Sequence, residues 1–311
     1  MTNNNAQLKI LTLDGGGSKG VYTLGVLSEL EQALNKPLHE YFELIYGTST
    51  GSIIAAMLAL GMNTTEIKKA YFELIPAIMC KRSQKKKSGE LSRLGKEIFG
   101  ERTFEAFNTN VGIVAMNYDN QKPLIFKSNL NAAHGSKTSF VPGFGVTILD
   151  AIEASCAACP IFSKKVLNTK NKEKLTAIDG GFIANNPTLF ALIDAKQALG
   201  REDHQIKLLS IGVGNYVEKP FSRTFKFLSR FEMAQITSKV LVASSNTTEV
   251  VTGLLFPNLP MVRINDTFNE PHYGTNMVEK DPNKLSTLFK LGIDSYAKHE
   301  KAVQNLLELS T

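Results

Sequence analysis

The first sixty residues contain the same pattern twice: an apolar run that ends in a glycine turn and leads directly into a helix. The run 8–13 ends in Asp-Gly-Gly-Gly, after which apolar residues recur at helical spacing up to residue 30. The run 42–46 enters the glycine-bounded turn 47–51 and continues as an apolar helix over 52–60. Two strand–turn–helix units in succession predict a parallel sheet covered by helices.

The alternation continues along the chain. Further strands are predicted at 111–116, 124–126, 175–178 and 208–213, and further helices at 64–78, 148–158 and 187–199. From about Tyr216 the chain reads as mainly helical, with a strand at 261–264 and a terminal helix at 284–309. We therefore expect an α/β fold with a mostly parallel central sheet. No repeat or low-complexity linker interrupts it, so residues 1–311 are predicted to form one domain.

The second glycine turn carries a candidate nucleophile. Gly47-Thr-Ser49-Thr-Gly51 fits the G-x-S-x-G elbow, in which small flanking residues let the backbone turn sharply and expose the serine oxygen above a strand end. The motif is short enough to occur by chance, but here a predicted strand precedes it and a helix follows. We therefore interpret Ser49 as the nucleophile, with Gly47 and Gly51 shaping the turn.

The first glycine turn offers backbone amides to an anion. Gly15, Gly16 and Gly17 lie at a predicted helix N-terminus, followed by Lys19 and Gly20, and such amides could hold the developing oxyanion of an acyl transfer. Gly15, Gly17 and Gly20 also satisfy G-x-G-x-x-G, so a dinucleotide site is an alternative. That site wants an acidic residue after the next strand, where this chain has its serine elbow.

A third turn supplies a candidate base. Asp179-Gly180-Gly181 follows the predicted strand at 175–178, and a carboxylate on a glycine turn can approach a serine closely enough to accept its proton. Each of the three strings is unspecific alone. Their joint occurrence is what points to an acyl hydrolase.

Together these motifs resemble those of the patatin-like phospholipases, over roughly residues 8–214. The family's oxyanion loop matches residues 14–20, its serine elbow residues 47–51 and its Asp-Gly turn residues 179–181. Two supporting segments match as well: the small-residue helix ending in proline, 154–160, and the stretch 180–187 that leads into Asn-Asn-Pro. Lys19 stands where the family often has arginine, and cysteines replace small residues in the small-residue helix.

The resemblance implies a three-layer fold and a lipid acyl hydrolase of phospholipase A or lysophospholipase type. It makes Ser49 the nucleophile and Asp179 the base of a dyad, with the amides around Gly15 to Gly17 as oxyanion hole and no metal or cofactor. Residues 215–311 are then a mainly helical extension packed on the core. Some bacterial relatives are switched on by a nucleotide or a host factor, and the sequence leaves any activator of this chain unidentified.

Three other functions stay open on the residues alone. A Ser-His-Asp esterase would need a histidine after the acid, and His204, His272 and His299 follow Asp179. A dinucleotide-binding protein and a lipid-binding protein without catalysis are the others.

The net charge of +6 is concentrated partly in residues 81–96, a basic stretch that begins at Lys81 and ends at Lys96. Such a stretch could contact anionic lipid head groups transiently, although a solvated, mobile loop is the alternative. Nucleic acid is not expected, because no aromatic residue interleaves the charges to stack a base.

Three cysteines do not make a disulfide scaffold, and Cys156-x-x-Cys159 lacks the two further ligands of a zinc site. Both cysteines are expected to pack on one face of the predicted helix. The polar start, 1–7, does not resemble a secretory signal, and no apolar run approaches the roughly 20 residues that cross a bilayer. The cytoplasm, with transient association to a membrane surface, is therefore the expected location.

Overall fold

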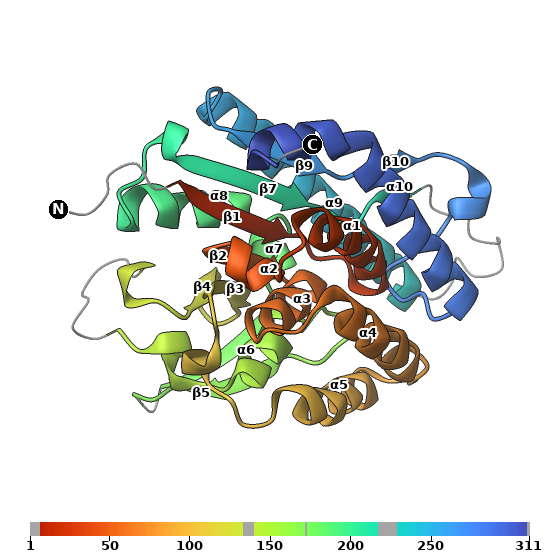
Figure 1. Ribbon diagram of the computed structural model, residues 1–311. Helices are drawn as coiled ribbons and strands as arrows, with labels where there is room; N and C mark the ends of the chain where they lie inside the picture. Colours follow the sequence, from red (N-terminus) through yellow and green to blue (C-terminus); the bar gives the residue numbers. More distant parts are fainter. Residues whose placement is uncertain (1–6, 133–139, 172, 217–228, 310–311) are drawn as a thin grey trace.

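The computed structural model describes residues 7–132, 140–171, 173–216 and 229–309 (Figure 1). Within them, a main sheet runs in the order β5-β6-β3-β2-β1-β7-β9, and β4 also pairs with β3. Its strands are β1 (Leu8–Leu13), β2 (Leu44–Thr48), β3 (Asn110–Asn117), β4 (Lys122–Lys127), β5 (Lys165–Asn168), β6 (Lys174–Asp179), β7 (Ile206–Ile211) and β9 (Met261–Ile264). Five neighbouring strands of this sheet are parallel: β3, β2, β1, β7 and β9. The strands β4, β5 and β6 add antiparallel pairs.

Helices cover both faces of this sheet. The helices are α1 (Gly20–Leu34), α2 (Leu38–Tyr41), α3 (Thr50–Ala59), α4 (Thr64–Met79), α5 (Gln84–Phe99), α6 (Ile148–Ser155), α7 (Gly181–Ala184), α8 (Thr188–Ile193), α9 (Ser229–Leu255) and α10 (Pro282–Leu307). A small second sheet pairs β8 (Asn215–Tyr216) with β10 (Thr267–Phe268).

Alternate residues of the buried strands belong to different cores, as the period of two of a strand requires. Leu11 and Leu13 of β1 pack into the larger core with α1, α3, α4 and α10, whereas Leu8 and Ile10 pack with α8. The sheet is therefore the middle of three layers. The predicted α/β class with a mostly parallel, helix-covered sheet is confirmed.

The described elements after residue 228 are built into this architecture. Strand β9 pairs with β7 along the main sheet, at the place predicted from residues 261–264. Helix α10 packs on α1, and Gly25 and Gly292 lie at their contact. A Cβ on either glycine would collide with backbone of the facing helix, so the two backbones approach as closely as glycine permits.

Two local expectations are wrong. Most of the basic stretch forms the regular helix α5 and not a loop, because Ser83 caps it and the Glu90 carboxylate pairs with Lys81 and Arg93. The expected helix 148–158 ends at Ser155, so its two cysteines do not share a helical face: Cys156 is buried and Cys159 is exposed.

Candidate active site

Ser49 occupies the sharp turn between β2 and α3. Its φ of 51° and ψ of −121° lie in a strained region that a non-glycine residue adopts only where its surroundings impose it. A Cβ on Gly47 would meet the backbone of Gly51, and one on Gly51 would meet the Leu13 carbonyl. The two glycines of the motif are thus required by close backbone packing around the serine.

Two neighbouring serines hold the turn in place. The Ser49 amide donates to Ser155 Oγ at 2.8 Å, and that hydroxyl in turn donates to the carbonyl of Val114 in β3 at 2.5 Å. The Ser49 carbonyl accepts from Ser52 Oγ at 2.6 Å. These bonds tie the elbow to α6 and β3 and so fix the backbone of the serine. Ser49 itself is buried, with 8% of the residue exposed.

Strand register brings Asp179 beside Ser49. Thr48 of β2 pairs with Val114 of β3, and the next β3 residue, Ala115, pairs with Asp179 of β6. Both residues therefore flank β3 at one level, about 10 Å apart between Cα atoms at two strand spacings. The mostly parallel sheet expected from the sequence would place Asp179 in a row of parallel strand ends. Strand β6 instead runs antiparallel to β3, so Asp179 does not belong to such a row. It reaches the same level from the opposite direction.

Asp179 is fully buried, and burial raises the pKa of its carboxyl to about 6. The nearby Ser49 hydroxyl and the Gly181 amide oppose that rise in pKa. Oδ1 accepts from the Gly181 N–H at 2.7 Å, whereas Oδ2 has no hydrogen-bond partner among the residues that the structure describes. Gly180 packs against the Val114 carbonyl, leaving no room for a side chain beside this carboxylate. One carboxylate oxygen is thus anchored and the other is available to accept a proton.

The glycine loop lies against the serine. A Cβ on Gly15 would come within 3.2 Å of Ser49 Cβ. The Gly15 amide, however, donates to the Asn185 carbonyl at 3.0 Å, so it is already engaged. The amides of Gly16 and Gly17 make no hydrogen bond within the described part of the chain. Of the three glycines expected to offer donors to an oxyanion, Gly16 and Gly17 thus have amides without a partner in the described residues.

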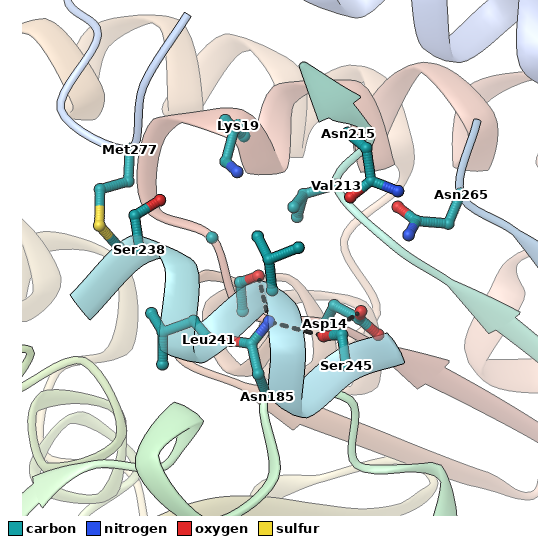
Figure 2. Close-up of a pocket in the computed structure, with 13 residues that line it drawn as sticks. Asp14, Lys19, Asn185, Val213, Asn215, Ser238, Leu241, Ser245, Asn265 and Met277 are labelled. Carbon is teal, nitrogen blue, oxygen red and sulfur yellow. Dashed lines mark hydrogen bonds between the residues drawn. The ribbon is translucent and has the colours of Figure 1, made fainter. Parts of the chain in front are cut away.

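Asp14, at the start of this loop, is held by an ion pair. Arg263 of β9 donates to both carboxylate oxygens, at 2.8 and 2.6 Å, and both side chains are nearly inaccessible to water. Ser245 of α9 donates to Asp14 at 3.0 Å and accepts from the Asn185 amide group at 2.8 Å. Figure 2 shows Asp14, Asn185 and Ser245 at a pocket of about 10 Å³, which Lys19 also lines.

The sequence analysis missed three residues that build this site. Ser155 was read only as a small residue, and Asn185 only as part of a matching segment. Arg263 lies within an apolar run predicted as a strand, and a charged residue there needs a buried partner. That signal could have drawn attention to Arg263, although nothing local identifies Asp14 as the partner.

The histidines downstream of Asp179 lie in other surroundings. His299 in α10 pairs with Asp266 at 2.9 Å, His272 pairs with Glu270 at the surface, and His204 lies in a short 3₁₀ turn after α8.

Burial raises the pKa of the Cys156 thiol, which neighbours Ser49 and Ser52. No group of three or more metal-ligating side chains is found in the described residues, and none of the described helices is long and apolar enough to span a bilayer.

Comparisons with known proteins agree with this geometry. The sequence profile of the patatin-like phospholipases matches residues 11–192. A cUMP-AMP-activated phospholipase of Escherichia coli is 42% identical over 299 residues, which cover 96% of this chain and 93% of the relative. A cGAMP-activated phospholipase of Escherichia coli strain TW11681 is 29% identical, over 66% of this chain and 62% of the relative.

Solved structures show the same fold at low sequence identity. Human GIVD cytosolic phospholipase A2, in complex with methyl gamma-linolenyl fluorophosphonate, superposes with a TM-score of 0.51 at 10% identity. The match covers 99% of this chain and 59% of that one. With the profile spanning more than half of the sequence and a relative alike over nearly all of it, the chain belongs to the patatin-like phospholipase family, the serine hydrolases that cleave acyl esters of lipids.

Proposed function

We propose that Ser49 and Asp179 form the catalytic dyad of this phospholipase. The Ser49 hydroxyl oxygen attacks the acyl carbonyl carbon while its proton passes to Asp179 Oδ2. The tetrahedral intermediate collapses, the ester bond breaks, and the departing lysolipid alkoxide takes the proton back from Asp179. Water then attacks the acyl-serine while Asp179 accepts its proton, and this proton passes to the departing Ser49 oxygen as the fatty acid is released. The observation that carries this assignment is the buried Oδ2 of Asp179, unpartnered among the described residues, at the level of the strained serine.

The amides of Gly16 and Gly17 are proposed as the donors to the oxyanion. They have no partner among the described residues, and they precede the N-terminus of α1, where the helix dipole favours negative charge. The Asp14–Arg263 ion pair anchors the start of this loop to β9. Gly15 then holds the loop against Asn185 and does not donate to the intermediate.

The dyad is tested by matched variants. A fluorophosphonate probe should label the parent protein and fail to label Ser49→Ala. Asp179→Asn should lower kcat on a soluble p-nitrophenyl ester by several orders of magnitude, because it removes the proton acceptor. His204→Ala, His272→Ala and His299→Ala serve as controls and should keep most of the activity. A histidine variant as inactive as Ser49→Ala would replace the dyad by a triad.

The lipid substrate is identified by mass spectrometry on a panel of phospholipids, lysophospholipids and galactolipids, with Ser49→Ala as the blank. Phospholipid hydrolysis is the expected result, and the released fatty acid reports which of the two ester positions is cut. Turnover confined to galactolipids would contradict a phospholipid substrate.

We further infer that a cyclic dinucleotide activates this enzyme. The support is the relative named a cUMP-AMP-activated phospholipase, whose likeness extends over 96% of this chain, including the region after residue 192. Adding cUMP-AMP to the purified protein should raise phospholipid hydrolysis by more than about tenfold, which corresponds to about 1.4 kcal/mol of coupling, while cGAMP should act more weakly. Equal activity with and without either nucleotide would contradict this inference.

A further inference from the structure

Helix α9 has its apolar side chains on the outside. Five of the ten large apolar residues that the described structure exposes belong to this one helix, and Leu254 and Val250 are 77% and 61% exposed. The exposed positions recur at intervals of four and three residues along one stripe: Ile236, Val240, Ala243, Thr247, Val250 and Leu254. A helix on a protein surface ordinarily turns such a stripe toward the core.

The buried face of α9 is mostly polar. Its buried positions are Thr237, Leu241, Ser245, Thr248 and Thr252, so four of these five residues carry a hydroxyl. This inversion of the usual pattern has a local explanation on the inner side, since Ser245 bonds to Asp14 and to Asn185. Nothing in the described part of the chain explains the outer side, and an exposed apolar stripe of this length marks a contact surface.

The inner face of α9 contacts the candidate active site. Leu241 packs against Gly181, beside the Asp179 carboxylate, and against Ile161 and Met277. Figure 2 shows Leu241 and Ser245 on α9 directed toward the loop that carries Asp14. The pocket between α9 and this loop holds about one water molecule, far too little for an acyl chain. Ser49 and Asp179 do not line this pocket, so α9 adjoins the candidate site at its glycine loop and at the Asp179 turn.

Positive charge lies near one end of α9. Gln84, at the start of α5, donates to the Pro160 carbonyl at 2.7 Å, and Thr237 of α9 donates to the Cys159 carbonyl at 3.3 Å. The adjacent carbonyls of Cys159 and Pro160 thus connect the beginning of α5 to α9. Lys85 and Lys86 are exposed at this junction. Between residues 235 and 255, α9 itself has only one lysine and one glutamate.

We propose that the outer face of α9 docks on the surface of an anionic phospholipid bilayer, and that docking brings the adjoining active site to its lipid substrate. An apolar helix face bordered by lysines is the pattern of a helix that lies in a membrane interface. The proposal rests on the lipid substrate argued above. It adds that the bilayer is the partner of this face, through a helix that contacts both the Asp179 turn and the glycine loop.

Docking can be measured without catalysis, because the chain has no tryptophan. Val240→Trp in the Ser49→Ala background places a single fluorescent reporter on the stripe. Val166→Trp is the matched control, since Val166 in β5 is 48% exposed against 46% for Val240 and lies at the far edge of the sheet.

With vesicles of phosphatidylcholine and phosphatidylglycerol, the emission of the Val240→Trp protein should shift to the blue and be quenched by brominated acyl chains. The emission of the Val166→Trp protein should stay unchanged. Equal responses of the two proteins, or no response of the reporter on the stripe, would overturn the proposal.

A second measurement separates docking from chemistry. The double variant Val250→Gln and Leu254→Gln should lose at least about tenfold activity on vesicles, because two apolar side chains no longer enter the bilayer. Its activity on a soluble p-nitrophenyl ester should stay within about twofold, as should both activities of Val166→Gln. Both reactions are run with cUMP-AMP present. Equal losses on both substrates, or no loss on vesicles, would contradict a docking role for the stripe.

A second copy of the chain is the competing occupant of this face. Sedimentation at several protein concentrations distinguishes the two, because a shared interface would make the parent protein a dimer that the double variant dissociates. A monomeric parent that binds vesicles supports the lipid surface. A dimer lost in the double variant, with vesicle binding intact, would assign the stripe to the second copy and overturn the proposal. Loss of fluorophosphonate labelling in Ser49→Ala is read separately, so failure of the dyad cannot be mistaken for failure of docking.

Discussion

The Asp179 carboxyl lies near the proposed nucleophile, but burial makes its charged form unfavourable. Its carboxyl is fully buried, and a rise in pKa from 3.8 to about 6 corresponds to about 3 kcal/mol of disfavoured charge. The folded protein therefore holds this proton more tightly than the unfolded chain. Stability from this group is present below about pH 4 and is lost as the pH rises through about 6. At neutral pH the enzyme keeps a charged base at the expense of folding free energy.

Asp179→Asn should for this reason unfold less readily than the parent at pH 7.5, by up to about 3 kcal/mol, although it is inactive. Urea denaturation of both proteins at about pH 7.5 and about pH 4 measures the effect. The difference in the free energy of unfolding should shrink at the lower pH, where the folded parent holds its proton without cost. A variant less stable than the parent at the higher pH would show that the Asp179 charge is compensated by its surroundings.

The same pKa sets the acid limb of the pH–rate profile. As the proposed base, Asp179 must be ionised before attack, so kcat/KM should rise with a slope of one up to about pH 6 and then level off. Hydrolysis of a soluble p-nitrophenyl ester from about pH 4.5 to about pH 8.5 gives the profile, with circular dichroism at each pH as the control for folding. A midpoint near 4 would mean that the free enzyme does not raise the pKa of its base.

At the scale of elements, the start of α5 is expected to assist membrane binding. Lys85 and Lys86 are exposed, whereas Lys87 donates to the Met79 carbonyl and serves the fold. Changing Lys85 and Lys86 to glutamine should weaken binding to anionic vesicles by about 1 kcal/mol per lysine at low salt. The loss should fade at high ionic strength, where charges are screened. Vesicle co-sedimentation measures both, and binding that is unchanged at low salt would exclude this role.

The contact between α1 and α10 predicts opposite effects of one substitution at two helical glycines. Gly292→Ala should destabilise the protein by at least about 1–3 kcal/mol, because its Cβ would overlap the Tyr22 carbonyl. Gly89→Ala in α5 has open space around it and should stabilise by about 0.5–1 kcal/mol through helix propensity. Thermal unfolding compares the two. Similar melting temperatures would mean that α10 shifts freely on α1.

Elements with a strong local pattern were predictable from sequence, and the contacts between them were not. Strand β1 and strand β9 have the bounds that their apolar runs predicted. The sequence of the basic stretch did not reveal its helix, and both a mobile loop and a membrane contact were compatible with it. The helix depends on a serine cap and on ion pairs between residues one turn apart. The antiparallel direction of β6 has no sequence signal, since a short apolar run reads the same in either direction. The roles of Ser49 and Asp179 remain predictions that the variants above test.

At the scale of the whole molecule, an ion pair joins the start of the chain to the edge strand β9. Arg263→Ala should cost about 3–5 kcal/mol, because it leaves the Asp14 carboxylate buried without its partner. Arg263→Lys keeps the charge, loses the two-point contact, and should fall between the parent and the alanine variant. Denaturant unfolding ranks the three proteins, and an alanine variant as stable as the parent would show that water or Ser245 suffices for Asp14.

This ion pair also orders events during synthesis. Asp14 leaves the ribosome 249 residues before the arginine that neutralises it, and strand β9 can join the sheet only after that arginine has emerged. A growing chain therefore carries its nucleophile and its glycine loop long before the loop has its anchor. Nascent chains stalled after Gly214 should hydrolyse no ester, whereas chains released at full length should. Hydrolysis would thus begin only after translation has passed the strand that completes the sheet.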